Sequence, residues 1–154
     1  MSRTPLSSWL LRTLQVLGMA WTLPNTALGL IAGAVSLAHG AHAHVSAREL
    51  AIVFHRVPFG PGGALTLGNV ILHTGHTLDE PCRTYAHRAG HGEEPRILLA
   101  DHERAHIYQY MVLGIFFLPL YGLCGGVSVR NRFERAADRY ALHGVGWWPW
   151  SRSR

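Results

Sequence analysis

Apolar positions dominate the N-terminal part of the chain. Between Thr13 and Ala47 there is no Asp, Glu, Lys or Arg, and residues 14–38 alone are long enough to cross a bilayer as one helix. Pro24 interrupts this stretch. Because proline fits the first turn of a helix but not its interior, the pattern predicts either one kinked span or two short helices. We therefore predict that residues 1–47 form a membrane anchor or a helical hairpin.

A cleaved signal peptide is the alternative for the same segment. Arg3 and Arg12 precede the apolar run, and Ala41-His42-Ala43 is similar to a cleavage site. The apolar run is longer than the hydrophobic region of a signal peptide, so the pattern favours an anchor.

The pattern changes character at residue 48. Two stretches rich in β-branched and aliphatic residues, 49–54 and 64–72, flank the Pro- and Gly-rich segment 58–63 and predict a β-hairpin. Residues 73–95 are polar and contain glycines and prolines, so they predict an irregular surface loop. Histidines in this loop are competing candidates for metal ligands, but their irregular spacing is more typical of surface residues: His73, His76, His87 and His91. No role is predicted for His39, His42 and His44.

The C-terminal part predicts two helices with an apolar connection. The first begins at Pro95, which suits a first helical position, and runs to Gly114. Asn131 can cap the second helix and Gly144 can end it. Residues 107–129 form a second run without charges, and its glycines and proline disfavour one straight helix. The tail combines aromatic and cationic residues, typical of a membrane interface or of a segment docked on the core: Trp147, Trp148, Trp150, Arg152 and Arg154.

Composition narrows the classes of function. The chain is 48% hydrophobic and 15% charged, which disfavours a soluble, highly charged binding module and excludes intrinsic disorder. Its basic residues are all arginines and the net charge is +5, which suits an anionic membrane surface. Without lysine and without a clustered basic face outside the tail, binding of nucleic acid is not expected. Cys82 and Cys124 cannot form a disulfide framework, whereas 11 histidines point to metal chemistry.

One motif carries chemistry. His102-Glu103-Arg104-Ala105-His106 is an H-E-x-x-H sequence on a predicted helix, which places both imidazoles on one face where they can bind a single Zn²⁺. Glu103 lies beside them as the candidate general base, which takes a proton from a metal-bound water. Glu103 is therefore the predicted catalytic residue, and the two histidines are predicted metal ligands.

A catalytic zinc needs a third protein ligand and one open position. Glu134, on the next predicted helix, is the candidate. Asp138 follows one turn later on the same face, where its carboxylate could orient a ligand histidine.

These residues resemble the pattern of the gluzincin metallopeptidases, in which H-E-x-x-H is followed by E-x-x-x-D on a second helix. The match covers the two motif histidines, Glu103, Glu134 and Asp138. The metzincin pattern does not fit, because Gln109 and Val112 stand where that group has a glycine and a third histidine.

A longer pattern resembles a small uncharacterised bacterial membrane-protein family. It comprises Trp-Thr-Leu-Pro-Asn-Thr at 21–26, Ala-Leu-Thr-Leu-Gly-Asn-Val-Ile-Leu at 64–72, His-Ile-Tyr-Gln-Tyr at 106–110, Leu-Pro at 118–119 and Asn-Arg-Phe-Glu at 131–134. This resemblance covers most of the chain and implies no substrate.

Each candidate has an alternative without chemistry. The two motif histidines could be solvated on a helix surface. Glu134 could complete a capping box with Asn131, three residues earlier. Asp138 could pair with Arg135 or Arg139 on an exposed face.

The zinc hypothesis constrains the second apolar run. Glu134 must come within a few ångströms of the motif histidines, whereas a straight span between them would separate the ligands by roughly 30 Å. Residues 107–129 must then turn back as a helical hairpin, which we predict around Leu118-Pro119. Arginines flank both apolar runs and gather near the C-terminus, which predicts that the site lies on the cytoplasmic side of the membrane. The resemblance to a bacterial membrane-protein family implies that this membrane is a bacterial inner membrane.

The sequence thus predicts an α+β fold: a minimal zincin-like domain over residues 48–154, with a β-hairpin beside the metal helix. The expected activity is zinc-dependent hydrolysis of peptide bonds, with membrane lipid and a peptide or protein substrate as partners. The strand at 64–72 is the expected place for substrate to bind by strand addition. The alternative is a non-catalytic integral membrane protein, with a structural or degenerate metal site, that acts as a scaffold.

Overall fold

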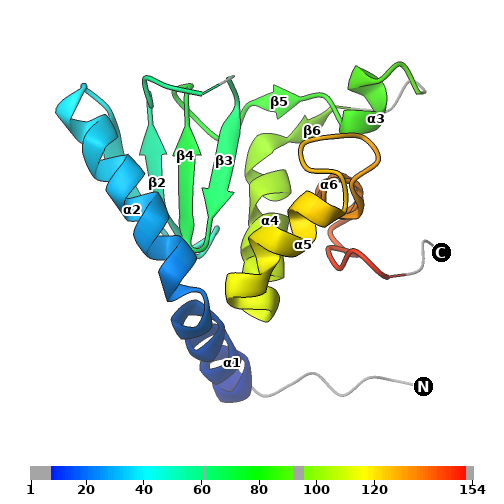
Figure 1. The fold of residues 1–154 in the computed structure, drawn as a ribbon, viewed down its shortest axis with the longest axis horizontal. Coiled ribbons are helices and arrows are strands. Elements are labelled where there is room, and N and C mark those ends of the chain that lie inside the picture. Colours follow the sequence, from blue (N-terminus) through cyan, green and yellow to red (C-terminus); the bar gives the residue numbers. More distant parts are fainter. Residues whose placement is uncertain (1–7, 61, 92–95, 152–154) are drawn as a thin grey trace.

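The computed structural model describes residues 8–60, 62–91 and 96–151. Helices and strands are mixed, which confirms the α+β class (Figure 1). The helices are α1 (Ser8–Trp21), α2 (Leu23–Ala38), α3 (Tyr85–Arg88), α4 (Leu99–Leu113), the 3₁₀ turn η1 (Gly114–Phe116), α5 (Phe117–Leu123) and α6 (Arg132–His143). The strands are β1 (His42–Ser46), β2 (Ala51–His55), β3 (Ala64–Leu67), β4 (Val70–His73), β5 (Pro81–Cys82) and β6 (Ile97–Leu98).

The main sheet has the order β1-β2-β4-β3, which corrects the predicted hairpin. β2 and β3 are not neighbours: β2 pairs with β4 in parallel, and β3 pairs with β4 antiparallel. The hairpin lies within residues 64–72, where Gly68, at φ 60°, and Asn69 form a two-residue turn. β1, unforeseen from the sequence, adds antiparallel to β2. β3 is consequently an edge strand.

Helices cover both faces of the sheet. On one face, α2 runs along β4 and β3, and its Gly29 and Gly33 allow close approach: an added Cβ would lie 2.7 Å from Val70 Cβ and 2.3 Å from the Phe54 ring. On the other face, α4 packs against the sheet. Its residues Ala100 and Ile107 share a core cluster with Val53 of β2 and Ile71 of β4. Strands buried on both faces suit their β-branched composition.

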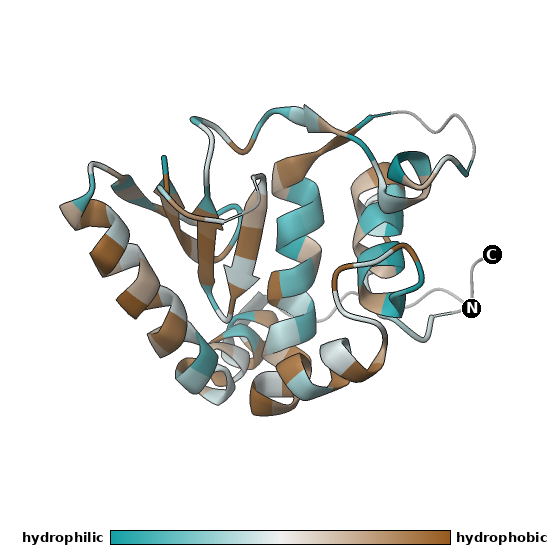
Figure 2. Ribbon diagram, turned by 45° about the horizontal axis from the view of Figure 1, so that its top comes forward, coloured by the Kyte–Doolittle hydropathy of each residue, from teal (hydrophilic) through white to brown (hydrophobic). Residues whose placement is uncertain are grey.

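The N-terminal apolar segment forms two helices. α1 and α2 meet at Thr22 with a bend of 67°, and Pro24 lies in the first turn of α2, as expected. Their outward faces leave many large apolar side chains exposed, among them Trp9, Val16, Leu17, Leu23, Ile31 and Val35. In Figure 2, hydrophobic residues, drawn in brown, recur along the length of α2.

Two helical stretches in the described part of the chain are long and apolar enough to cross a membrane. One is the bent pair α1 and α2, counted together, and the other is Leu99–Leu123, in which α4, η1 and α5 are counted as one helix although the backbone leaves the helical conformation at Gly114. Buried helices of soluble proteins and signal sequences satisfy the same criterion.

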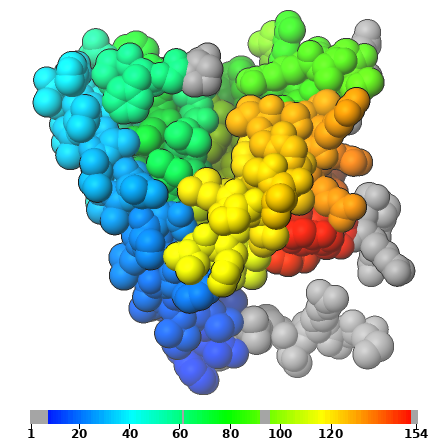
Figure 3. Space-filling view, in the orientation of Figure 1, coloured from blue at the N-terminus to red at the C-terminus, as the bar shows by residue number. Residues whose placement is uncertain are grey.

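The second apolar run turns back at Gly114, earlier than predicted. Gly114 has φ 54°, and a Cβ there would lie 2.3 Å from Trp21 Nε1, so only glycine fits without strain. Pro119 lies instead in the first turn of α5, where its missing N–H is not needed. The turn lets the chain return toward α6: α5 crosses α4 in Figure 1 and lies on the face of the molecule shown in Figure 3.

Both predicted C-terminal helices are present. α4 begins at Leu99 rather than Pro95, because Ile97–Leu98 form β6; Pro95 is outside the described residues. The N-cap Asn131 of α6 accepts a hydrogen bond from the backbone N–H of Phe133 at 2.9 Å, and Gly144 ends α6 in the left-handed conformation, as predicted. Residues 73–95 are less irregular than predicted, since they include β5 and α3.

Candidate metal centre

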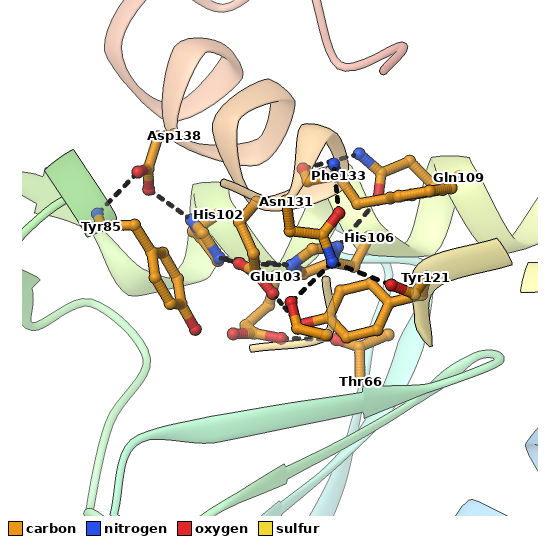
Figure 4. Close-up of polar contacts among 12 residues, drawn as sticks. Thr66, Tyr85, His102, Glu103, His106, Gln109, Tyr121, Asn131, Phe133 and Asp138 are labelled. Atoms are coloured by element: carbon orange, nitrogen blue, oxygen red, sulfur yellow. Dashed lines mark hydrogen bonds and ion pairs between the residues drawn. The ribbon is translucent and has the colours of Figure 1, made fainter. Parts of the chain in front are cut away.

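Three potential metal ligands converge between α4 and α6. His102 and His106 lie one helical turn apart on α4, and Glu134 lies in the first turn of α6 (Figure 4). Their ligand atoms all lie within 4.8 Å of one another, and among the described residues this is the only such group of three. All three side chains are buried. The fold therefore brings together the ligand set that the motif predicts.

The spacing of the three atoms suits tetrahedral coordination. His102 Nε2 lies 3.2 Å from His106 Nε2, and Glu134 Oε2 lies 3.1 Å from the former and 3.4 Å from the latter. Zinc ligands at about 2.0–2.1 Å in a tetrahedron are separated by roughly 3.3 Å. The triangle thus has the dimensions of one tetrahedral face and leaves the fourth corner for a further ligand.

Neighbouring side chains determine which imidazole nitrogens carry protons. His102 Nδ1 lies 3.0 Å from Asp138 Oδ1, and His106 Nδ1 donates to Gln109 Oε1 at 2.8 Å. The amide orientation of Gln109 follows from its Nε2, which donates to the carbonyl oxygens of Phe133 and Trp147. Both Nδ1 atoms therefore hold protons, and the two Nε2 lone pairs point toward the Glu134 carboxylate.

Three electron-pair donors at this separation require a cation between them. A proton can serve when no metal is bound. Burial alone lowers the pKa of His102, but the carboxylates of Asp138 and Glu134 beside its two nitrogens raise that pKa to about 10. Burial of Glu134 favours its neutral form, yet the two histidines outweigh this effect and hold its pKa well below the usual range. The donor set fits either an imidazolium or a divalent metal ion.

Glu103 lies beside the three ligands without belonging to them. Its side chain is buried, and its Oε2 accepts a hydrogen bond from Thr66 Oγ1 at 2.6 Å. Thr66 comes from the edge strand β3, so the sheet orients the predicted base. A second carboxylate oxygen is left to take a proton.

Two tyrosines, not foreseen from the sequence, complete the surroundings. Tyr121 on α5 donates its hydroxyl to Glu134 Oε1. The ring of Tyr85 stacks on His102 with a centroid distance of 5.9 Å, and its backbone N–H donates to Asp138 Oδ2 at 2.7 Å. Burial is the main reason that the pKa of both phenols is raised, with the charge of Glu134 next, so both stay protonated and can donate hydrogen bonds.

The structure also decides between the alternatives for individual residues. The motif histidines are not solvated, since they are 5% and 7% exposed. Glu134 does not cap Asn131, whose N–H donates to Ser128 O. Asp138 contacts His102 and Tyr85, whereas Arg139 binds carbonyl groups of the tail.

The tail and the remaining histidines lie outside this group. The ring of Trp147 packs on Tyr108 and that of Trp150 on Phe133, so the tail docks on the core; Arg152 and Arg154 are outside the described residues. His73 is fully buried at the end of β4, which corrects its placement on the surface.

Comparison with known proteins gives no relative: no protein-family model matches the chain, and neither the curated proteins nor the solved structures include a match.

Proposed function

We propose that the chain is a membrane-associated zinc metallopeptidase that hydrolyses peptide bonds with a metal-activated water. The observation that carries the proposal is the convergence of His102, His106 and Glu134 next to a carboxylate that is not a ligand. A structural zinc site is normally closed by four protein ligands, whereas three ligands and a free base are typical of a catalytic one.

Each residue has a separate part in this chemistry. His102, His106 and Glu134 hold the metal, and Asp138 and Gln109 fix the two imidazoles. Bound zinc supplies a water of lowered pKa and polarises the peptide carbonyl. With the metal bound, Glu103 would accept a proton from the attacking water and pass it to the leaving amine.

The edge strand β3 is the proposed platform for substrate. One side of β3 pairs with β4, and no strand of the main sheet pairs with its other side among the described residues. An extended peptide could add there by backbone hydrogen bonds. Because Thr66 of β3 donates to Glu103, a peptide bound along this strand would pass close to the base.

A non-catalytic role is the second candidate, in which the metal ties α4 to α6 for stability or scaffolding. The burial of the ligands favours it, since Glu134 is only 3% exposed. Hydrolysis that depends on Glu103 distinguishes the two functions, because a structural site does not need a base.

Metal content is the first test of the proposal. Replacing His102 or His106 by Ala is expected to remove one equivalent of zinc from the purified chain, and Glu134→Ala to weaken that equivalent strongly, because two ligands bind less firmly than three. Metal analysis after dialysis measures both effects. Glu134→Ala protein that holds this zinc as tightly as the parent would refute the ligand set.

Membrane association is proposed from the exposed apolar faces of α1 and α2. Trp9, Val16, Leu17 and Ile31 are uncovered on these helices, and a contiguous exposed apolar surface is typical of a site that contacts a membrane or a protein. The distribution of the arginines favours the cytoplasmic side of a bacterial inner membrane for the centre.

Fractionation tests this attachment. The full-length chain is expected to stay with membranes through high-salt and alkaline washes, because salt weakens only electrostatic binding. Exchanging two outward residues, Val16→Glu and Ile31→Glu, should release it into the soluble fraction. Release of the unaltered chain by salt alone would contradict insertion.

A further inference from the structure

Four histidines outside the metal centre gather on the main sheet. In the strand register His42 of β1 is opposite His55 of β2, and His73 of β4 follows the pairing of Phe54 with Leu72. His44 lies two residues along β1 on the same face as His42. The four come from three adjacent strands, at the end of the sheet where β2 and β4 finish.

The two inner histidines are buried with their nitrogens facing each other. His55 is 5% exposed and His73 is 0% exposed, and their Nδ1 atoms are 3.1 Å apart. His73 Nε2 lies 3.0 Å from Glu80 Oε1, so Nε2 carries the proton and Nδ1 presents a lone pair. This repeats the arrangement at His102, where one nitrogen faces a carboxylate and the other faces a second imidazole.

The outer histidines are placed to add further ligands. The ring of His42 stacks on His55 with a centroid distance of 5.2 Å, and the ring of His44 does so at 5.3 Å. Both outer side chains are exposed, so their rings can turn about the side-chain bonds at small cost. In the conformation described, only the Nδ1 atoms of His55 and His73 face each other closely. The third ligand would be His42 or His44 after rotation of its side chain.

The surroundings leave room for this pair and for entry of an ion. A Cβ at Gly75 would lie 2.8 Å from His73 Nε2 and 3.3 Å from Glu80 Oε1, so the glycine permits the carboxylate to reach the imidazole. A cavity of about 210 Å³ opens beside His44 and His55 and is also lined by the acidic Glu49 and Asp79, with Arg48 between them.

We propose that this histidine cluster, His42, His44, His55 and His73, is a second site for a divalent transition metal ion, with His55 and His73 as the buried ligands and an outer histidine completing it. Imidazole ligands without carboxylates suit Zn²⁺, Cu²⁺ or Ni²⁺ rather than Mg²⁺ or Ca²⁺. Glu80 orients His73 from outside the ligand sphere. The proposal is independent of the proposed peptidase activity.

Counting zinc tests the second site. In a chelating buffer that holds free zinc constant, the full chain is expected to retain two equivalents and His102→Ala to retain one. In the His102→Ala background, exchanging both outer histidines for Ala should remove the remaining equivalent. Since these two side chains are exposed, the fold is not at risk, and His91→Ala, at another exposed histidine, is the matched control.

A variant outside the ligand sphere gives a second measurement. Glu80→Gln is expected to weaken one of the two zinc equivalents by about 10–100-fold, the usual effect of losing the partner of a ligand histidine.

The outcomes separate the two metal sites. If the parent chain binds one zinc and His102→Ala binds none, the metal centre is supported and the second site is refuted. His55 and His73 then share a hydrogen bond only. A single zinc that survives His102→Ala but is lost on removing His42 and His44 supports the second site and refutes the first. Zinc that survives all these substitutions refutes the histidine cluster as a site.

Discussion

Glu103→Gln is expected to retain all its zinc and to lose peptide hydrolysis by about 10²–10⁴-fold, the contribution of a well-positioned general base. Glutamine keeps the size of the side chain, and its amide oxygen can still accept the hydrogen bond from Thr66 Oγ1. Only the ability to take a proton from water is removed. Metal content and the rate on unstructured peptides, measured on detergent-solubilised protein, check the two halves of the expectation.

Glu49→Gln is the matched control for this variant. Glu49 is similarly buried, at 6% exposed, but it contacts Ser46 and Arg48 away from the centre, so its exchange should leave the rate unchanged. Equal, background-level rates for the parent and Glu103→Gln, with zinc bound in both, would remove the support for an enzyme and favour the non-catalytic role.

The potential metal ligands could be found in the sequence because the spacing within each pair is a matter of local helix geometry. Four residues on a helix place His102 and His106 on one face whatever surrounds them, and the same spacing joins Glu134 to Asp138. The N-cap Asn131 and the terminal Gly144 likewise act through the backbone next to them. These features need no knowledge of which elements are neighbours in space.

The sheet could not be predicted in the same way. The stretches 49–54 and 64–72 follow one another in the sequence with one short segment between them. Their apolar composition suits parallel and antiparallel strand pairing equally. The real order depends on Gly68, which turns the chain within the second stretch, and on α2 and α4, which cover the two faces. The strand order depends on tertiary contacts, and the composition of a short apolar run does not specify these contacts.

The residues around the ligands could not be predicted for the same reason. Thr66 reaches Glu103 only because β3 lies at the edge of the sheet next to α4, and Tyr121 reaches Glu134 only because the chain turns at Gly114. Neither contact has a signature in residue spacing. Gln109 is the exception, because it follows His106 by three residues, the interval of one helical turn, and that spacing is a usable signal.

Zinc affinity at the metal centre is expected to rise by about 100-fold between about pH 6.5 and pH 8.5, roughly tenfold per pH unit for one displaced proton. The raised pKa of His102, about 10, means that the metal-free centre holds a proton throughout this range, and zinc must replace it. The sign for folding is opposite: protonation of His102 stabilises the metal-free fold fully below pH 6.5, and that contribution is lost as the pH approaches 10.

Asp138→Asn tests the cause of this dependence. Without the carboxylate at 3.0 Å from Nδ1, the pKa of His102 falls, and the affinity should stop rising at a lower pH than in the parent. Asp79→Asn, at an exposed carboxylate paired with Arg48, should keep the parent's slope. Competition with a chromophoric chelator at a series of pH values measures each curve. An affinity independent of pH in the parent would mean that no proton occupies the place of the metal, and the interpretation of the three converging atoms as a cation site held by His102 would fail.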